Sequence, residues 1–207
     1  MLSDRRKEAL VIIWLNGAFG SGKTTCAFEL QRRLPNAFVY DPEDLGEFLN
    51  HHFPKSLQEN DFQDYPFWRQ FNYAMLRQIA KEFDGIIIVP MTVTNRRYYD
   101  ELIGRLIAEG ITVKHYILSA SAKTLKQRLN KRLEFGQTWG KRHIDSCIEA
   151  FENVITGRII MTDQMTIDAI IEVIAEESSI SLIPDKRFPV KKWIDRRKIT
   201  LNHIRKG

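Results

Sequence analysis

The chain has 207 residues, of which 43% are hydrophobic and 28% are charged, as in an ordinary globular protein. This length fits one domain with a sizeable core, and no apolar run approaches the roughly 18 residues of a membrane-spanning helix. The net charge of +5 is unevenly placed, because residues 185–207 hold nine Lys or Arg against two Asp while the remainder is slightly acidic. We therefore expect no nucleic-acid partner, since the basic excess belongs to one terminal segment.

The cysteines and the first residues of the chain bear on its location. Cys26 and Cys147 are the only cysteines and lack the spacing of a metal site, which is typical of reduced thiols in the cytosol. The N-terminal ten residues are polar and do not resemble a signal peptide. The sequence therefore predicts a cytoplasmic protein.

The first predicted element is a buried strand at residues 10–15, and a phosphate-binding loop follows it. Residues 17–24 read GAFGSGKT, a full match to the pattern G-x-x-x-x-G-K-[ST]. A glycine-rich turn that binds nothing is the alternative, but a strand before the loop and a helix after it argue against that interpretation. The predicted nucleotide-binding residues are Gly17, Ala18, Phe19, Gly20, Ser21, Gly22, Lys23, Thr24 and Thr25.

Several positions of this loop have a physical task. Gly17 and Gly22 allow backbone conformations that are closed to other residues, so that successive N–H groups can turn inward around a phosphate. Lys23 places a positive charge near the β and γ phosphates, and the hydroxyl of Thr24 can ligate Mg²⁺. A helix beginning at Lys23 would direct its positive dipole at the same anion. The loop therefore predicts ATP and Mg²⁺ as ligands.

Strands and helices alternate along the rest of the chain. Further strands are predicted at residues 37–40, 85–91, 111–120 and 158–161. Further helices are predicted at residues 43–52, 67–83, 95–109, 122–135, 143–155 and 166–177. Such alternation predicts about five parallel strands with helices on both faces. We therefore expect an α/β fold, a P-loop NTPase three-layer sandwich of the nucleoside- or small-molecule-kinase-like type, over residues 1–184.

Apolar residues in the predicted helix 67–83 repeat at helical spacing, which predicts an amphipathic helix. The residues of this repeat are Phe67, Phe71, Ala74, Met75, Ile79 and Phe83.

Asp41 directly follows the second predicted strand, at the edge of the sheet where ligands of open α/β folds bind. Its carboxylate is predicted to accept the proton of a substrate hydroxyl, or to help hold Mg²⁺. An Asx turn is the structural alternative. The third predicted strand ends in Pro90-Met91-Thr92 and not in the metal-binding Asp of larger ATPases, which favours a small-molecule kinase over a motor-type ATPase.

Arg128 and Arg132 lie four residues apart and therefore share one face of the predicted helix 122–135. The glycine-bounded segment that follows, at about residues 133–143, is predicted to be a mobile lid. Both arginines would then neutralise charge on the transferring phosphoryl group, whereas the alternative is a solvated basic face. The predicted catalytic residues are Lys23, Asp41, Arg128 and Arg132.

An aromatic cluster lies between the second and third predicted strands. Part of it must be core, but an insertion at this point of the fold is where an acceptor would bind, and aromatic walls suit a planar or greasy ligand. Arg69 would meet an anionic acceptor group, with a surface role as the alternative. The predicted substrate-binding residues are Asp41, Phe62, Tyr65, Trp68, Arg69, Met91 and Thr92.

Seven blocks of the sequence are distinctive as a set. They read IIWLNGAFGSGKT (12–24), VYDPE (39–43), DFQDYPFWRQFNY (61–73), GIIIVPMTV (85–93), IGRLIAEG (103–110), RLNKR (128–132) and LNHIR (201–205). With these blocks the chain resembles the bacterial tunicamycin-resistance proteins almost from end to end. The resemblance implies an ATP-binding protein that confers resistance to tunicamycin, a nucleoside antibiotic with sugars and a fatty acyl chain. For some members it also implies membrane association through the C-terminus.

Three functions are consistent with these features. We expect a kinase-like protein that transfers the γ-phosphate of MgATP to a hydroxyl of tunicamycin. The alternative is a non-catalytic protein that binds and sequesters the drug, with ATP as a structural or switching ligand. A nucleic-acid-binding ATPase is the third, and the confinement of the basic excess to residues 185–207 argues against it.

Residues 188–205 predict a basic amphipathic helix. Its apolar stripe consists of Val190, Trp193, Ile194, Leu201 and Ile204. This pattern suits an anionic membrane surface, so that the protein would be peripheral at the inner face of the cell membrane. In the alternative, the stripe packs on the body of the protein and leaves the basic face in water.

Overall fold

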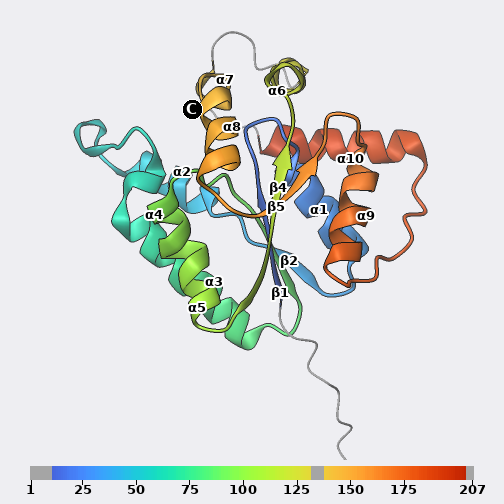
Figure 1. Ribbon diagram of the computed structural model, residues 1–207, viewed down its shortest axis with the longest axis horizontal. Coiled ribbons are helices and arrows are strands. Elements are labelled where there is room, and N and C mark those ends of the chain that lie inside the picture. Colours follow the sequence, from blue (N-terminus) through green and yellow to red (C-terminus); the bar gives the residue numbers. More distant parts are fainter. Residues whose placement is uncertain (1–10, 132–137, 204–207) are drawn as a thin grey trace, which may run out of the picture.

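The computed structural model of the chain describes residues 11–131 and 138–203, which form a three-layer α/β sandwich (Figure 1). The middle layer is a sheet in the order β2-β3-β1-β4-β5, and every neighbouring pair of strands is parallel. The strands are β1 (Val11–Asn16), β2 (Ala37–Val39), β3 (Ile86–Pro90), β4 (Thr112–Ser119) and β5 (Arg158–Met161). The predicted sheet of five parallel strands is confirmed.

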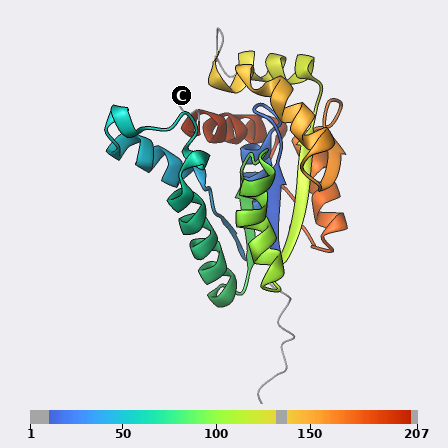
Figure 2. The ribbon, with the colours of Figure 1, turned by 60° about the vertical axis from the view of Figure 1, so that its left-hand side comes forward.

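Helices cover both faces of the sheet (Figures 1 and 2). The helices are α1 (Lys23–Arg33), α2 (Glu43–His52), α3 (Pro66–Glu82), α4 (Arg96–Tyr99), α5 (Arg105–Ala108), α6 (Ala122–Asn130), α7 (Trp139–Arg142), α8 (Ile144–Asn153), α9 (Ile167–Glu177) and α10 (Pro189–Asn202). A π-helical turn at Asp100–Gly104 joins α4 to α5, so the helix predicted at 95–109 is one interrupted helix. Short 3₁₀ turns at Lys55–Leu57 and Phe62–Asp64 occupy the loop between α2 and α3.

Part of the predicted lid falls outside the described residues. The helix predicted at 122–135 is α6, which ends at Asn130, before the described residue Lys131. Arg132 and residues 133–137 of the predicted lid lie outside the described ranges, whereas α7 occupies most of the remainder, at Trp139–Arg142. The lid therefore stays a prediction.

Alternate side chains of β1 enter two different cores. Ile12 and Trp14 belong to the core under α3 and α5, whereas Ile13 and Leu15 belong to the core under α1 and α9. All four side chains are fully buried. A central parallel strand with both faces covered must be apolar at every position, which explains the continuous apolar run of this segment. A third cluster packs α6 and α8 against the end of β4.

The apolar repeat that predicts α3 does not mark its buried face. The aromatic residues Phe67 and Phe71 of that repeat are exposed. The residues of α3 that are buried are Trp68, Arg69, Asn72, Tyr73 and Leu76. Hydrogen bonds make this face suitable for burial, since Trp68 Nε1 donates to the Pro42 carbonyl at 3.1 Å and Tyr40 donates to Asn72 Oδ1 at 2.7 Å. Over its first three turns the apolar repeat therefore faces away from the core, whereas Ile79 and Phe83 at its end are partly buried against that core.

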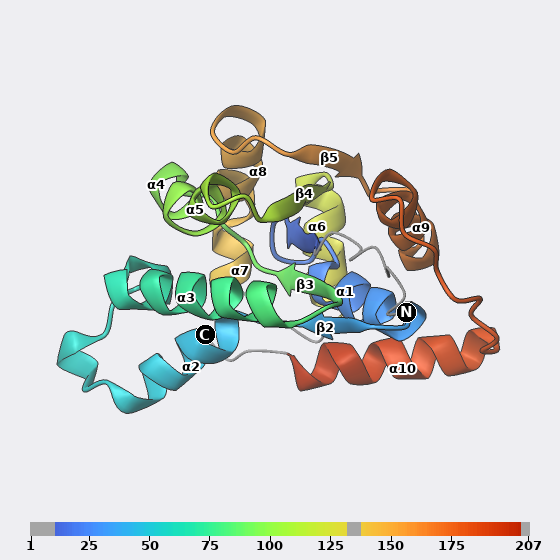
Figure 3. The same cartoon turned by 90° about the horizontal axis from the view of Figure 1, so that it is seen from below.

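The C-terminal helix α10 also packs by the face opposite to its apolar stripe. It lies along α1 (Figure 3). Val190, Trp193 and Leu201 are exposed, whereas Asp195 is buried. The contact with the body is ionic, and Arg196 of the helix pairs with Glu29 of α1 at 3.5 Å. The alternative in which the apolar stripe packs on the body is therefore wrong for its described residues, because charged residues make the contact. Ile204 of the stripe lies outside the described ranges.

The buried face of α3 leads to a stability prediction. We expect Leu76→Ala to lower the free energy of unfolding by about 2–5 kcal/mol, because Leu76 is 0% exposed in the core between α3 and the sheet. Phe71→Ala should change it by less than about 0.5 kcal/mol, because Phe71 is 50% exposed on the other face of the same helix. Chemical denaturation of the two variants measures both values. The reverse ranking would show that the apolar repeat packs against the sheet.

Candidate functional site

The backbone of the loop between β1 and α1 takes conformations that residues with a side chain rarely adopt. The φ angle is 143° at Gly17, 85° at Gly20 and 101° at Gly22. A Cβ atom at Gly17 would lie 2.5 Å from the carbonyl oxygen of Leu118, so the loop passes directly against the end of β4. Both the left-handed angles and this close approach require glycine. Residues with a side chain would therefore not fit at these glycine positions of the predicted phosphate-binding loop.

Asn16, which the sequence pattern does not reveal as a site residue, holds the start of this loop. It is buried, and its Oδ1 accepts from the backbone N–H groups of Gly17 and Val93, each at 2.9 Å. Its Nδ2 donates to the Val93 carbonyl at 2.9 Å and lies 3.2 Å from Nε2 of His115. Burial lowers the pKa of His115 to about 4, so the neutral ring can accept that hydrogen bond. A polar residue at the end of an apolar run is the signal that identifies it.

Lys23 is buried at the start of α1, and its ammonium group contacts the loop itself. Nζ donates to the carbonyl of Gly17 at 2.8 Å and to that of Ala18 at 3.3 Å. The hydroxyl of Thr92, at the end of β3, donates to the same Gly17 carbonyl at 2.8 Å. The Gly17 carbonyl, directly after β1, thus accepts hydrogen bonds from α1 and from the segment after β3.

Ser21 supplies the observation that points to an anion in this loop. Its side chain is buried, and its hydroxyl has no hydrogen-bond partner within the described ranges. A buried hydroxyl without a partner is costly, and a phosphate oxygen would accept its hydrogen. Lys23 and the positive N-terminus of α1 would favour the same anion. The loop therefore fits the phosphate chain of a nucleotide.

A cavity of about 680 Å³ opens beside the loop. It is lined by the loop itself, by α6, by the segment after β5 and by α10. Among its lining residues are Gly20, Ser21 and Gly22, together with Thr25 of α1. A volume of this size suits a nucleotide or a drug-sized ligand.

Arg128 lies in this cavity and is fixed to the segment after β5. Its Nη1 donates to Thr162 Oγ1 at 3.0 Å and its Nη2 donates to the Thr162 carbonyl at 2.6 Å. Asp163 then accepts the hydroxyl hydrogen of Ser121, the N-cap of α6, at 2.7 Å. These contacts hold α6 against the end of β5, so Arg128 has a defined position beside the loop. Its action on a phosphoryl group stays a prediction, as does that of Arg132.

Asp41 lies two residues after β2, at the carboxyl edge of the sheet. Its Oδ1 accepts from the backbone N–H of Glu43 at 3.0 Å, which is the Asx turn considered as its structural alternative. A carboxylate offers about four lone-pair sites, so the turn does not exclude a second task. Thr24 is half-buried in the first turn of α1. The roles of these two residues as metal ligands, and of Asp41 as the base, stay predictions.

Several predicted substrate-binding residues pack in the interior. Tyr65, Trp68 and Met91 are buried, and the ring of Phe62 lies 5.2 Å from that of Trp68. The hydroxyl of Tyr65 donates to the Leu57 carbonyl at 3.3 Å. These contacts organise the insertion between β2 and β3. Binding of a substrate by these residues stays a prediction.

Arg69 is a buried residue and not a surface one. It pairs with Glu101, donates to the Gln63 carbonyl, and places its guanidinium 4.3 Å from the centre of the Tyr98 ring. The surface role considered for Arg69 is therefore wrong, because its side chain is enclosed between α3 and the helix of α4 and α5. These contacts support a structural task for the guanidinium group.

Asp61 is a carboxylate that the sequence pattern does not single out, although it opens the block DFQDYPFW. It caps the 3₁₀ turn Phe62–Asp64 and accepts from the backbone N–H of Gln63 at 2.9 Å. Burial raises the pKa of Asp61. A carboxylate with a raised pKa suits proton transfer.

Comparisons with known proteins agree with this geometry. The chain is 25% identical over 155 residues to the adenylyl-sulfate kinase of Aeromonas hydrophila, a match that covers 72% of this chain and 76% of that protein. The structure resembles the Deinococcus radiodurans tunicamycin resistance protein, with a TM-score of 0.73 and 28% identity over 85% of this chain and 99% of the other. The resemblance to tunicamycin-resistance proteins inferred from the sequence is confirmed by this similarity.

Other kinases share the fold at lower identity. The shikimate kinase of Bacteroides thetaiotaomicron matches with a TM-score of 0.55 and 21% identity, over 82% of this chain and 99% of that one. The APS kinase of Mycobacterium tuberculosis matches with a TM-score of 0.54 and 15% identity, over 83% of this chain and 98% of that one. Residues 12–154 match the family model of the AAA domain, which is more than half of the chain. The chain therefore belongs to the AAA domain family, and its fold is that of a P-loop kinase.

Proposed function

We propose that the protein is an ATP-dependent phosphotransferase that transfers the γ-phosphate to a hydroxyl of tunicamycin. The loop carries this proposal, through its left-handed glycines, the buried Lys23 and the Ser21 hydroxyl that lacks a partner in the described part of the chain. The kinase fold supports the class of reaction, and the similarity to the Deinococcus protein supports the drug as the acceptor. Phosphorylation would add about 1.5–2 negative charges to the drug and so weaken its fit to a target.

Each group of the site has a task in this proposal. MgATP, when bound, supplies the phosphoryl group. Backbone N–H groups of residues 17–22 and Nζ of Lys23 bind its phosphates, and the hydroxyl of Thr24 ligates the Mg²⁺. Asp41 accepts the proton of the drug hydroxyl, and Asp61 is the second candidate for this task because burial raises its pKa. Arg128 neutralises charge near the phosphates.

Binding without chemistry is the second candidate function. The Asx turn of Asp41 favours it, because that carboxylate is already engaged by a backbone N–H group. Incubation of the protein with MgATP and tunicamycin, followed by mass spectrometry of the drug, separates the two functions. A phosphate-mass adduct that depends on the protein supports the transferase. Unmodified drug that stays bound to the protein would support sequestration.

Removal of the Lys23 ammonium group should nearly abolish nucleotide binding. We expect Lys23→Ala to weaken binding of MgATP by roughly 100-fold or more, because it removes the buried charge of the loop. Isothermal titration calorimetry measures the affinity, and circular dichroism checks that the fold persists. Lys123→Ala, on the exposed side of α6, is the control and should bind as the wild type does. Equal affinities for wild type and Lys23→Ala would contradict the assignment of the loop.

Replacement of the Asp41 carboxylate tests whether Asp41 is the general base or has a structural role only. We expect Asp41→Asn to keep the affinity for ATP within several-fold and to lower phosphoryl transfer by roughly 10²–10⁴, because the amide keeps the Asx turn but cannot take a proton. Asp61→Asn is the matched variant at the second carboxylate. Single-turnover assays measure the rate of phosphoryl transfer by both variants. A large loss of rate in Asp61→Asn with no loss in Asp41→Asn would assign the base to Asp61.

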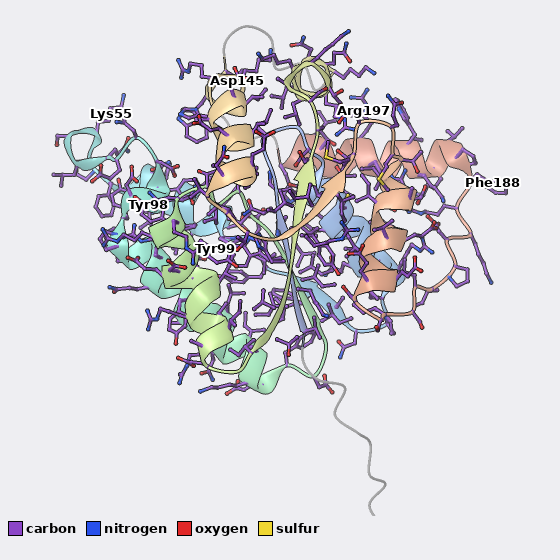
Figure 4. All side chains as sticks on the ribbon, viewed as in Figure 1. Lys55, Tyr98, Tyr99, Asp145, Phe188 and Arg197 are labelled. Atoms are coloured by element: carbon purple, nitrogen blue, oxygen red, sulfur yellow. The ribbon has the colours of Figure 1, made fainter. Side chains whose placement is uncertain are left out.

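We also propose that residues 185–207 bring the kinase-like body, residues 1–184, to an anionic membrane surface. Phe188, Val190 and Leu201 are exposed and apolar, and Figure 4 shows Phe188 at the outer end of α10. Lys198 adds an exposed positive charge on the same helix. Within the described ranges, every helix is too short or too polar to cross a membrane. The attachment would therefore be peripheral and sensitive to salt.

Polar substitutions on the apolar stripe test this attachment. We expect the double variant Val190→Ser/Leu201→Ser to sediment with anionic vesicles at low salt much less than the wild type does, because it loses the apolar contact with the lipid. Substitutions are preferable to truncation, because truncation would remove Arg187 and Arg196, two basic partners of the buried Glu29. Vesicles of neutral lipid are the control. Equal sedimentation of variant and wild type would contradict the proposal.

A further inference from the structure

One wall of the cavity beside the phosphate-binding loop is made by α10. The lining residues of this wall are Pro189, Lys192, Trp193, Arg196, Arg197 and Thr200. They recur at intervals of three or four residues and therefore lie along one side of the helix. This side overlaps the apolar stripe at Trp193, whereas Val190 and Leu201 of the stripe do not line the cavity. Gly20, Ser21 and Gly22 line the same cavity. The C-terminal helix and the loop thus share one cavity, although they lie far apart in the sequence.

Ionic contacts fix this wall in place. Glu29, which is 0% exposed in α1, pairs with Arg187 and with Arg196. Arg196 also binds Asp168 of α9 at 2.7 Å, and Lys192 binds Asp185 at 3.2 Å. Carboxylate oxygens of Glu29, Asp168 and Asp185 lie within 4.8 Å of one another, but the basic side chains neutralise them. The cluster therefore anchors α10 and leaves no reason to assign a metal ion to it.

Further contacts tie the wall to the neighbouring helix. Nη1 of Arg197 donates to the Lys131 carbonyl, at the end of α6, at 2.9 Å. Figure 4 shows Arg197 on the side of α10 that faces α6, away from Phe188. Arg128 of α6 lines the cavity as well. Two helices thus bring cationic side chains to the cavity.

Two features of the wall point to a ligand. Nε of Arg196 is buried and has no hydrogen-bond partner within residues 11–131 and 138–203. Trp193 lines the cavity yet is 61% exposed, and the Arg197 guanidinium lies 5.5 Å from the centre of its ring. An indole beside a guanidinium group is a surface on which a flat base stacks. A bound base would cover Trp193, and an oxygen of the nucleotide would satisfy Arg196.

We propose that α10 is part of the nucleotide site, with Trp193 and Arg197 in contact with the base and Arg196 in contact with a sugar or phosphate oxygen. This inference rests on the proposed binding of a nucleotide at the loop. The loop holds the phosphate chain at one end of the cavity, so the nucleoside extends into the remainder, where α10 forms the wall. The C-terminal helix then acts on nucleotide affinity directly.

The test compares a nucleotide with a ligand that has phosphates only. The full-length protein is titrated with the non-hydrolysable analogue AMPPNP and with inorganic tripolyphosphate, each with Mg²⁺. We expect Trp193→Ala to weaken AMPPNP binding by about 5- to 100-fold and to leave tripolyphosphate binding within about two-fold of wild type. Leu201→Ala, an exposed apolar residue of the same helix that does not line the cavity, should change neither affinity.

A charge-matched pair completes the experiment. Arg197→Gln and Lys198→Gln each remove one positive charge from α10, but only Arg197 lines the cavity. Arg197→Gln should weaken AMPPNP more than tripolyphosphate, whereas Lys198→Gln should affect both ligands slightly and equally. Thermal unfolding checks that each variant is folded.

The outcomes separate this inference from the proposed function. Unchanged or tighter AMPPNP binding by both Trp193→Ala and Arg197→Gln would overturn the inference about α10 and leave the loop assignment intact. Failure of the wild type to bind either ligand would overturn both. Absence of phosphate transfer to tunicamycin would refute the proposed reaction without changing these affinities.

Discussion

The close approach of Gly17 to the Leu118 carbonyl is the constraint on which the rest of the site depends. Because Gly17 has no Cβ, its backbone can press against the end of β4, and three side chains converge on this residue. Asn16 accepts from the N–H of Gly17, while Lys23 and Thr92 donate to the carbonyl of Gly17. The loop is therefore shaped by the protein before any ligand binds, so that little reorganisation would be needed when a phosphate enters.

The burial of Glu29 is the second constraint, and it concerns the C-terminus. A buried carboxylate needs cationic partners, since a buried charge left alone destabilises a fold by about 3–5 kcal/mol. Arg187 and Arg196 are two such partners of Glu29, so the C-terminal segment is held against α1 and borders the cavity beside the loop. The same helix carries exposed apolar residues, such as Val190 and Leu201, that do not line the cavity.

The segment between β2 and β3 is the part of the chain to consider for acceptor specificity, because the sheet is shared with several kinases. Kinases of shikimate and of APS have the same fold at 21% and 15% identity, so the sheet cannot select the acceptor. In this insertion Trp68 and Arg69 are buried and make structural contacts. The proposed base is therefore sought among the carboxylates of the insertion, Asp41 and Asp61.

The sequence by itself determined the parallel sheet, the loop and the positions of most helices, because these follow from local rules: apolar runs, helical spacing, and glycines at fixed intervals. It did not determine which face of α3 or of α10 is buried. On α3, hydrogen bonds make Trp68 and Asn72 better core residues than Phe71, and on α10 the partners of Arg196 come from α1 and α9. The contacts of Asn16 were likewise set by Val93 and His115, which lie far away in the sequence. Only the tertiary structure decided these points, because burial of a polar group depends on partners that lie far away in the sequence.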